Sequence, residues 1–327
     1  MKKFFTAILS MILCVLAVFG SACSDKKESG YSFMVPDGAP ALAVSKLIYD
    51  KDNLGTAKTI KYSVIQSTQV QPNLSSGKPD FIVAPVNLAS KLYKANSNDY
   101  VMVAVITHGN FYILSTTEIS VSDLKGKQVA VPNQGAVPDW TFKMVLEKHN
   151  ISYTDGADKV NINFQNNGSI IVQLIMSGSE TIGLVPEPAA SALEANYFNK
   201  TGKNLYRLDL QELYDSETKA YPQAVLMVKK SVISANPDIV STLQNKITAS
   251  VSWLNQNVTV AVDTINDNGG STLNANTLTA NAISGCKMYW EDAQSSKTSV
   301  KNYINKIVEI DNKKASAVSD DFFYLAQ

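Results

Sequence analysis

Arginine, histidine and cysteine are scarce in this sequence of 327 residues, and each scarcity excludes a class of function. The chain has one arginine, Arg207, and two histidines, His108 and His149. A zinc site needs more His or Cys ligands than this. The 29 basic residues are balanced by 29 acidic ones, so the strongly basic face typical of nucleic-acid binding is not expected. We expect no metal, no cofactor and no nucleic-acid partner.

Common catalytic motifs are missing as well. The sequence contains no G-x-S-x-G, no H-E-x-x-H, no Gly-rich phosphate loop and no C-x-x-C. Carboxylate chemistry stays open, because Asp37 and Glu187 could face a common cleft. Because the common motifs are missing, we expect no catalytic residues, and an enzyme is the alternative.

The N-terminus has the pattern of an export signal. Lys2 and Lys3 precede an almost wholly apolar run, Phe4 to Phe19, and the small residues Gly20-Ser21-Ala22 follow. This run is too short for a convincing membrane span. We predict a signal peptide over residues 1–22, whose removal leaves 305 residues with 27 basic and 29 acidic side chains.

Cys23 directly follows the small residues. Gly-Ser-Ala-Cys resembles the lipobox of bacterial lipoproteins, although Leu is usual where Gly20 stands. We predict lipidation of Cys23 and a polar tether up to residue 30, with Cys23 incidental to a plain secretory signal as the alternative. The remaining cysteines are Cys14, within the signal, and Cys286, expected to be a small buried residue rather than a reactive thiol.

Short apolar runs alternate with amphipathic segments along the mature chain, which predicts an α/β fold with mostly parallel sheets. The expected strands are Ser32–Val35, Thr59–Ile65, Phe81–Ala84, Tyr100–Thr107, Phe111–Ser115, Gln128–Val131, Val160–Phe164, Ile182–Val185, Leu205–Leu210 and Val225–Val228. The expected helices include Pro40–Tyr49, Leu88–Tyr93, Asp139–His149, Ile170–Met176 and Ala189–Ala195. From Asn236 onward the pattern is helical, with long helices at Val240–Asn255 and Ala293–Ile310.

A weak internal repeat predicts two similar lobes. Ser76-Gly77, the strand Phe81–Ala84 and Pro85 recur as Ser177-Gly178, Ile182–Val185 and Pro186, each 101 positions later. Upstream, V-P-D-G-A-P at Val35–Pro40 is echoed by V-P-N-Q-G-A-V-P at Val131–Pro138. The alternative is that all strand-turn-helix units look alike.

If the two lobes face each other, we expect four strand-to-helix corners to converge on one cleft: Asp37–Ala41, Pro85–Leu88, Gln134–Asp139 and Pro186–Ala189. Sheets of this kind bind ligands beyond the carboxyl ends of their strands, where helix N-termini offer free N–H groups. The candidate ligand contacts in these corners, in the polar loop after the second strand and at the crossing between lobes are Asp37, Gly38, Ala39, Gln66, Thr68, Gln69, Pro85, Asn87, His108, Asn110, Asn133, Gln134, Gly135, Trp140, Glu187 and Pro188.

Several of these residues have an ordinary structural alternative. Asp37 and Asp139 could cap helices instead of touching a ligand. Trp140 could be a core residue instead of a stacking platform, and His108 a hinge hydrogen-bonder instead of a catalyst. The sequence leaves these alternatives open.

Two segments resemble a known family. V-S-D-L-K-G-K-Q-V-A-V-P-N-Q-G at Val121–Gly135 is similar to the opening of the second lobe in solute-binding proteins of ABC importers, in the nitrate, sulfonate and thiamine-precursor group often called SsuA-like. L-I-M-S-G-S-E-T-I-G-L-V-P-E-P-A-A-S at Leu174–Ser191 resembles a later motif of that group, with Glu180-Thr181 where Asp is usual. The resemblance covers roughly Tyr31 to Val228.

This resemblance implies a type II periplasmic-binding fold, in which two α/β lobes are joined by a two-segment hinge around a ligand cleft. The hinge segments would lie near Thr107–Ser115 and Arg207–Pro222. Lobe 1 would comprise residues 31–111 plus 211–327, and lobe 2 residues 112–210. Glu187-Pro188 would reach the cleft, and the lobes would close on the ligand.

The implied function is an extracytoplasmic, lipid-anchored, monomeric solute-binding protein that delivers a small molecule to an ABC permease. Because the lone Arg207 lies in an expected strand, a neutral or aromatic ligand is slightly favoured over a carboxylate or sulfonate. The alternatives are an enzyme on the same fold, such as a pyrimidine-forming or chorismate-dehydrating relative, and a lipoprotein with a sensor or adhesion role.

Overall fold

The computed structural model describes residues 30–95 and 99–325. The predicted signal peptide, the lipidation site Cys23 and nearly all of the tether lie outside these residues. Within them, no helix has the length and apolar character needed to cross a membrane.

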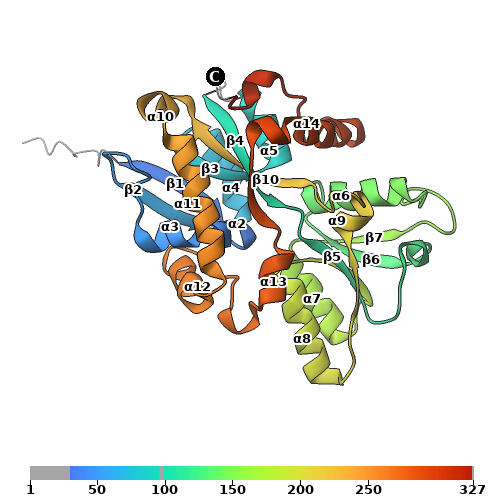
Figure 1. The fold of residues 1–327 in the computed structure, drawn as a ribbon. Coiled ribbons are helices and arrows are strands. Elements are labelled where there is room, and N and C mark those ends of the chain that lie inside the picture. Colours follow the sequence, from blue (N-terminus) through green and yellow to red (C-terminus); the bar gives the residue numbers. More distant parts are fainter. Residues whose placement is uncertain (1–29, 96–98, 326–327) are drawn as a thin grey trace, which may run out of the picture. The chain divides into compact units, whose positions relative to one another are not determined.

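Two sheets organise the described chain (Figure 1). The first sheet has the order β11-β4-β10-β3-β1-β2 and consists of β1 (Tyr31–Pro36), β2 (Ile60–Ile65), β3 (Phe81–Pro85), β4 (Tyr100–His108), β10 (Pro222–Lys229) and β11 (Met288–Asp292). The second has the order β7-β6-β8-β5-β9 and consists of β5 (Phe111–Ser115), β6 (Gln128–Pro132), β7 (Asn161–Gln165), β8 (Ile182–Pro186) and β9 (Tyr206–Asp209). We call the first sheet with its helices lobe 1 and the second lobe 2.

The central strands of each sheet are buried on both faces, which explains their continuous apolar sequences. On β1, Phe33 and Val35 join one core cluster while Met34 packs against the other. The first cluster includes residues of α2 (Ala39–Ala43), α3 (Ser45–Asp50), α11 (Ile239–Leu254), α12 (Val258–Asp267) and α13 (Ala280–Gly285). The second includes residues of α4 (Ser67–Ser75), α5 (Val86–Ala95) and α14 (Ala293–Ile310).

Lobe 2 follows the same plan. On β5, Phe111 and Ile113 face one core, and Tyr112 and Leu114 face the other. The covering helices are α6 (Val137–Lys148) and α9 (Leu210–Tyr214) on one side, and α7 (Gly168–Ser177) and α8 (Ala189–Thr201) on the other. Because successive side chains of a strand point to opposite faces of the sheet, each sheet packs against one layer of helices on either face.

The two sheets share one strand topology. Read in parallel, β4-β10-β3-β1-β2 of lobe 1 corresponds to β9-β5-β8-β6-β7 of lobe 2, and β11 is an additional edge strand. In both, one strand runs antiparallel to its two neighbours: β10 between β3 and β4, and β5 between β8 and β9. The sequence repeat falls on β3 and β8, which hold equivalent places, so the α/β fold with two lobes is confirmed.

Strands of lobe 1 come from both ends of the described chain and strands of lobe 2 from its middle. The first sheet uses segments within residues 31–108 and 222–292, and the second uses segments within 111–209. The limits predicted for the lobes, 31–111 plus 211–327 and 112–210, stay a prediction.

Two expectations about local structure are wrong. Met288–Asp292 lies in the tail expected to be helical, yet β11 pairs with β4 there, with an irregular register between Met288 and Glu291. The short Met-Tyr-Trp run has the residue types that favour an edge strand, but it lies between two helical segments, so the sequence pattern assigns it to the helical tail. The expected helix Pro40–Tyr49 is divided at Val44, because Ser45 Oγ donates to Leu42 O (2.9 Å) and the β-branched Val44 leaves helical geometry at φ −110°.

Two passages connect the lobes. The chain leaves lobe 1 after β4 and enters β5 through Gly109 and Asn110, and it returns from β9 through α9 to β10. Gly109 has φ +39°, and a Cβ there would lie 2.4 Å from Cε1 of the Tyr221 ring. Phe111 N donates to Gln211 Oε1 (3.0 Å), so the two passages pack side by side.

Candidate functional site

The register of the first sheet brings polar residues together where the passages begin and end. His108 pairs with Pro222, and Ala224 pairs with both Thr107 on β4 and Pro85 on β3. The ladder is irregular between Pro222 and Ala224, which leaves Gln223 at a bulge, a feature common beside binding sites. Asn87 and Asn110 follow two residues after Pro85 and His108. We call Asn87, Thr107, His108, Asn110 and Gln223 the hinge cluster.

Each member of the hinge cluster has a buried polar atom without a hydrogen-bond partner in the described part of the chain: Asn87 Oδ1, Thr107 Oγ1, His108 Nδ1, Asn110 Oδ1 and Gln223 Oε1. An unpaired buried polar atom costs about 1 to 3 kcal/mol, so such atoms are uncommon and call for an explanation. Their concentration at one end of one sheet makes this place the candidate site.

The other atoms of these side chains are held firmly. Asn110 Nδ2 donates to Glu187 O (2.8 Å), and Asn87 Nδ2 donates to Lys314 O (3.2 Å). His108 Nε2 lies 2.9 Å from Glu291 Oε2, and its ring stacks on Tyr289 with centroids 3.6 Å apart. Three of the five side chains, Asn87, His108 and Asn110, are therefore preorganised, with one polar end fixed and the other free.

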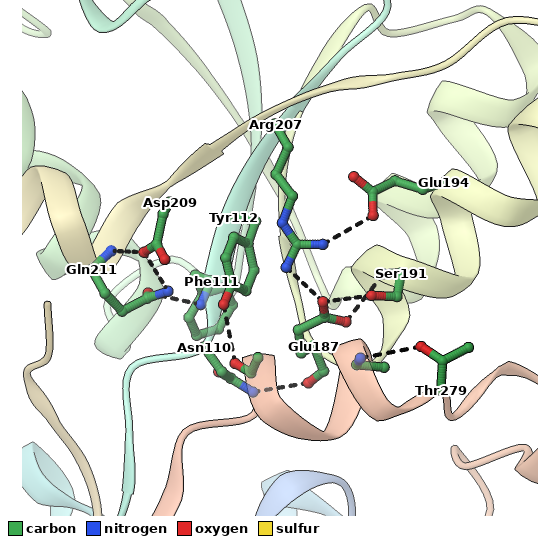
Figure 2. A network of polar contacts seen from close by, with 12 residues as sticks. Asn110, Phe111, Tyr112, Glu187, Ser191, Glu194, Arg207, Asp209, Gln211 and Thr279 are labelled. Atoms are coloured by element: carbon green, nitrogen blue, oxygen red, sulfur yellow. Dashed lines mark hydrogen bonds and ion pairs between the residues drawn. The ribbon is translucent and has the colours of Figure 1, made fainter.

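A buried ion-pair network supports the Asn110 end of the cluster from lobe 2 (Figure 2). Glu187, 2% exposed, follows β8, and its Oε1 accepts from Arg207 Nη2 (2.6 Å) and Ser191 Oγ (2.7 Å). Arg207 Nη1 donates to Glu194 Oε2 (2.9 Å), and its guanidinium lies 3.5 Å from the centroid of the Tyr112 ring. Since Glu187 N also donates to Asn110 O (2.8 Å), this network fixes the backbone beside the hinge.

The network shifts the pKa values of its members. Burial alone would lower the pKa of Arg207, but its hydrogen bond and attraction to Glu187 outweigh burial and raise it. Burial raises the pKa of Glu194, with Arg207 opposing, and raises the pKa of Tyr112 to about 12. Burial and the nearby Glu187 also raise the pKa of the Cys286 thiol well above its usual range, so this free cysteine is buried and protonated at neutral pH.

Segments of the C-terminal part contact lobe 2 at several points. The hydroxyl oxygens of Thr141 on α6 and Tyr303 on α14 lie 2.6 Å apart, and Tyr112 Oη donates to Gly285 O (3.2 Å). The Lys314 side chain lies against Gly135, with Cε 3.1 Å from where a Cβ would be. Lys314 thus touches a predicted corner of each lobe, through Asn87 and through Gly135.

Comparisons of the sequence with family models and with curated proteins find no match, whereas comparison with solved structures finds many. A crystal structure of an ABC transporter from Parabacteroides distasonis is 19% identical with a TM-score of 0.73, covering 91% of this chain and 100% of that one. The aliphatic sulphonate-binding protein SsuA from Escherichia coli is 14% identical with a TM-score of 0.66, covering 91% and 92%.

A third similar structure is the ligand-binding component of an ABC-type import system from Staphylococcus aureus, 13% identical with a TM-score of 0.61, covering 90% of this chain and 96% of that one. The chain has the periplasmic-binding-protein fold. At these identities the similarity establishes the fold, and it does not assign the ligands of the similar proteins to this chain.

In this binding-protein fold, the predicted contacts divide into three groups: buried, exposed and partly exposed. Asn87, His108, Asn110, Trp140 and Glu187 are buried, and all but Glu187 carry one of the unpaired atoms, Trp140 through Nε1. The residues exposed to solvent are Gln66, Thr68, Gln69, Asn133 and Gln134. Partly exposed are Asp37, Gly38, Pro85, Gly135 and Pro188, and Ala39 is buried in the core.

Structural roles are now visible for several of them. Asp37 Oδ2 accepts from the backbone N–H groups of Ser271 and Thr272 (2.8 and 3.0 Å) and does not cap α2. Asp139 pairs with Lys143 and accepts from Gly135 N (2.8 Å). Trp140 belongs to the core cluster shared with α14.

Sequence reasoning missed Thr107, Gln223 and the contact of Arg207 with Glu187. Thr107 and Gln223 each interrupt or border an apolar run, and that signal could have singled them out. Arg207 is on β9 as expected, but its long side chain reaches across the sheet to a residue 20 positions earlier, which no local pattern reveals.

A concavity lies on lobe 2. It has a volume of about 390 Å³ and is lined by Lys143, Tyr153, Thr154, Lys159, Val160, Asn161, Ile162 and Phe164. None of these belongs to the hinge cluster or to the predicted contacts, so we place the candidate site at the junction of the lobes.

The Glu187–Arg207 pair predicts a large coupling in stability. Arg207→Met should lower the free energy of unfolding by about 3 kcal/mol, because Glu187 would stay buried without its counter-charge. Adding Glu187→Gln should recover at least about 1 kcal/mol of that loss. Urea unfolding of the two single variants and the double variant measures this coupling.

Lys219→Met is the matched control, because it removes an ion pair whose side chains are 50% and 52% exposed, Lys219 and Glu212. We expect a change below about 0.5 kcal/mol there. Additive effects of Arg207→Met and Glu187→Gln on the free energy of unfolding would show that the two side chains do not stabilise each other.

Proposed function

We propose that this chain is an extracytoplasmic solute-binding protein that captures a small molecule between its lobes and delivers it to an ABC importer. The observation that carries the proposal is the hinge cluster, in which buried polar atoms without partners gather where the lobes join. Binding-protein relatives by fold, from Parabacteroides distasonis and Staphylococcus aureus, belong to ABC systems, and this supports the same role here.

The proposed mechanism is hinge closure. Two passages join the lobes, and Gly109 and Gln211 lie where they touch. A ligand held by Asn87, Thr107 and Gln223 on lobe 1 gains contacts from the Trp140 side of lobe 2 only in the closed form. It therefore shifts the population toward that form by its differential affinity. The closed, monomeric form is the one offered to the permease, and no turnover takes place.

We further propose that residues 1–22 direct export and that Cys23 carries the lipid. With its amine exposed by cleavage and several acyl chains on one residue, the protein would be stably held at a membrane. The polar tether up to residue 30 would then give the binding domain freedom to meet the permease.

Ligand binding has a thermodynamic and a structural signature. A small-molecule extract of cells should raise the melting temperature by roughly 5 °C when a ligand reaches about 100 times its Kd, and it should lower the radius of gyration in solution scattering. The same extract passed through exhaustive dialysis is the control. Extracts that change neither quantity would argue against a solute-binding role.

Membrane anchoring depends on one thiol. In cells fed an alkyne-labelled fatty acid, the wild-type protein should be labelled and sediment with membranes, whereas Cys23→Ser should be unlabelled and leave the membrane fraction. Cys286→Ala is the control and should keep the label, because Cys286 is buried within the fold. Label on Cys23→Ser, or none on the wild type, would refute the anchor.

A further inference from the structure

We infer that the ligand of the hinge cluster is a neutral or cationic molecule presenting several N–H or O–H donors, and not an oxyanion. The inference rests on the proposed function, because it assigns a chemical class to the ligand of that same site. It follows from the role that each unpaired atom of the cluster can play in a hydrogen bond.

The two asparagine side chains can offer only acceptors. Asn110 Nδ2 faces the carbonyl oxygen of Glu187, and Asn87 Nδ2 faces that of Lys314. A carbonyl oxygen accepts hydrogen bonds and cannot donate, so these contacts determine which end of each amide is nitrogen. The free ends, Asn110 Oδ1 and Asn87 Oδ1, are therefore both oxygens.

A neutral His108 would add a third acceptor. Its Nε2 lies 2.9 Å from a carboxylate oxygen of Glu291, which can only accept, so Nε2 carries a hydrogen. In the neutral imidazole, the unpaired and buried Nδ1 then has a free lone pair. Thr107 Oγ1 and the Gln223 amide can act in either role, and Trp140 Nε1 is a donor that suits one acceptor on the ligand.

Two of the cations near the cluster, Arg207 and Lys143, are engaged in ion pairs, whereas Lys314 makes none with the described residues. Arg207, the single arginine of the sequence, pairs with Glu187 and Glu194. Lys143, beside Trp140, pairs with Asp139 at 2.9 Å. The Lys314 side chain lies at Gly135 and is exposed.

A sulfonate or nitrate in the cluster would set its oxygens against the lone pairs of Asn87, Asn110 and a neutral His108, and no lysine or arginine of the described residues is buried there to compensate. Burying an anion under these conditions is strongly unfavourable. Amines, amides, N–H heterocycles and amino sugars instead place hydrogens where the cluster has lone pairs. The buried acceptors thus select against the sulfonate that SsuA from Escherichia coli binds by its description.

The first test identifies what the native protein carries. Protein comprising residues 23–327 is purified in the absence of denaturant. It is then denatured, and mass spectrometry identifies any small molecule that is released. Melting temperatures are then measured with three donor-rich probes, cytosine, glucosamine and spermidine, and with three oxyanions, methanesulfonate, nitrate and phosphate. We expect a released molecule with at least three N–H or O–H hydrogens, and stabilisation by a donor-rich probe alone.

Other results separate this inference from the proposed function. A released oxyanion without N–H or O–H donors, or a melting-temperature rise with methanesulfonate, nitrate or phosphate, overturns the ligand class and leaves solute binding intact. If no molecule is released and neither probe set changes the melting temperature, both proposals are wrong.

The second test uses Gln223→Met, which removes a polar group that makes no hydrogen bond to the described residues. For the identified ligand we expect roughly 3- to 10-fold weaker binding, because one hydrogen bond is lost. Without ligand, the melting temperature should be unchanged or higher, because an unsatisfied buried group is gone. Gln173→Met, on an exposed position of α7, is the matched control and should change neither quantity. Equal affinity of the Gln223→Met and wild-type proteins would remove Gln223 from the site.

Discussion

The candidate site depends on two chain passages that run side by side between the sheets. In each sheet, the antiparallel strand is the one that the chain enters after leaving the other lobe. The strand β5 of lobe 2 follows β4 of lobe 1, and β10 of lobe 1 follows β9 of lobe 2. Because β10 then lies between β3 and β4, the ends of three strands come together. Thr107, His108 and Gln223 lie at these strand ends, where strand pairing satisfies backbone groups and leaves their side-chain atoms unpaired.

Close packing and hydrogen bonds fix the backbone at this junction. Gly109 leaves no room for a side chain beside Tyr221, and Gln211 joins the passages by accepting from Phe111 N. Glu187 is buried, and its carboxylate is compensated by Arg207 and Ser191. Against this ordered background, the free atoms of Asn87, His108 and Asn110 stand out, since buried polar groups elsewhere in proteins nearly always find partners.

Much of this architecture could be predicted from the sequence, and the reason is physical. The repeat at an offset of 101 residues records two strands, β3 and β8, in equivalent places of two sheets. Asn87, His108, Asn110 and Trp140 could be proposed as contacts from the sequence because they follow expected strands or open expected helices. Thr107 and Gln223 were missed, because their importance comes from the antiparallel insertion of β10, a pairing between residues more than 100 positions apart. The strand β11 and its Glu291 contact with His108 were hidden for the same reason.

A crystal structure of the protein as purified, without refolding, tests the account most directly. The account predicts a bound organic molecule at the lobe junction, with its N–H or O–H groups within hydrogen-bond distance of Asn87 Oδ1, His108 Nδ1 and Asn110 Oδ1. Those three atoms bonded only to water or to the protein itself, with a ligand seated instead in the lobe 2 concavity beside Lys143 and Tyr153, would contradict it.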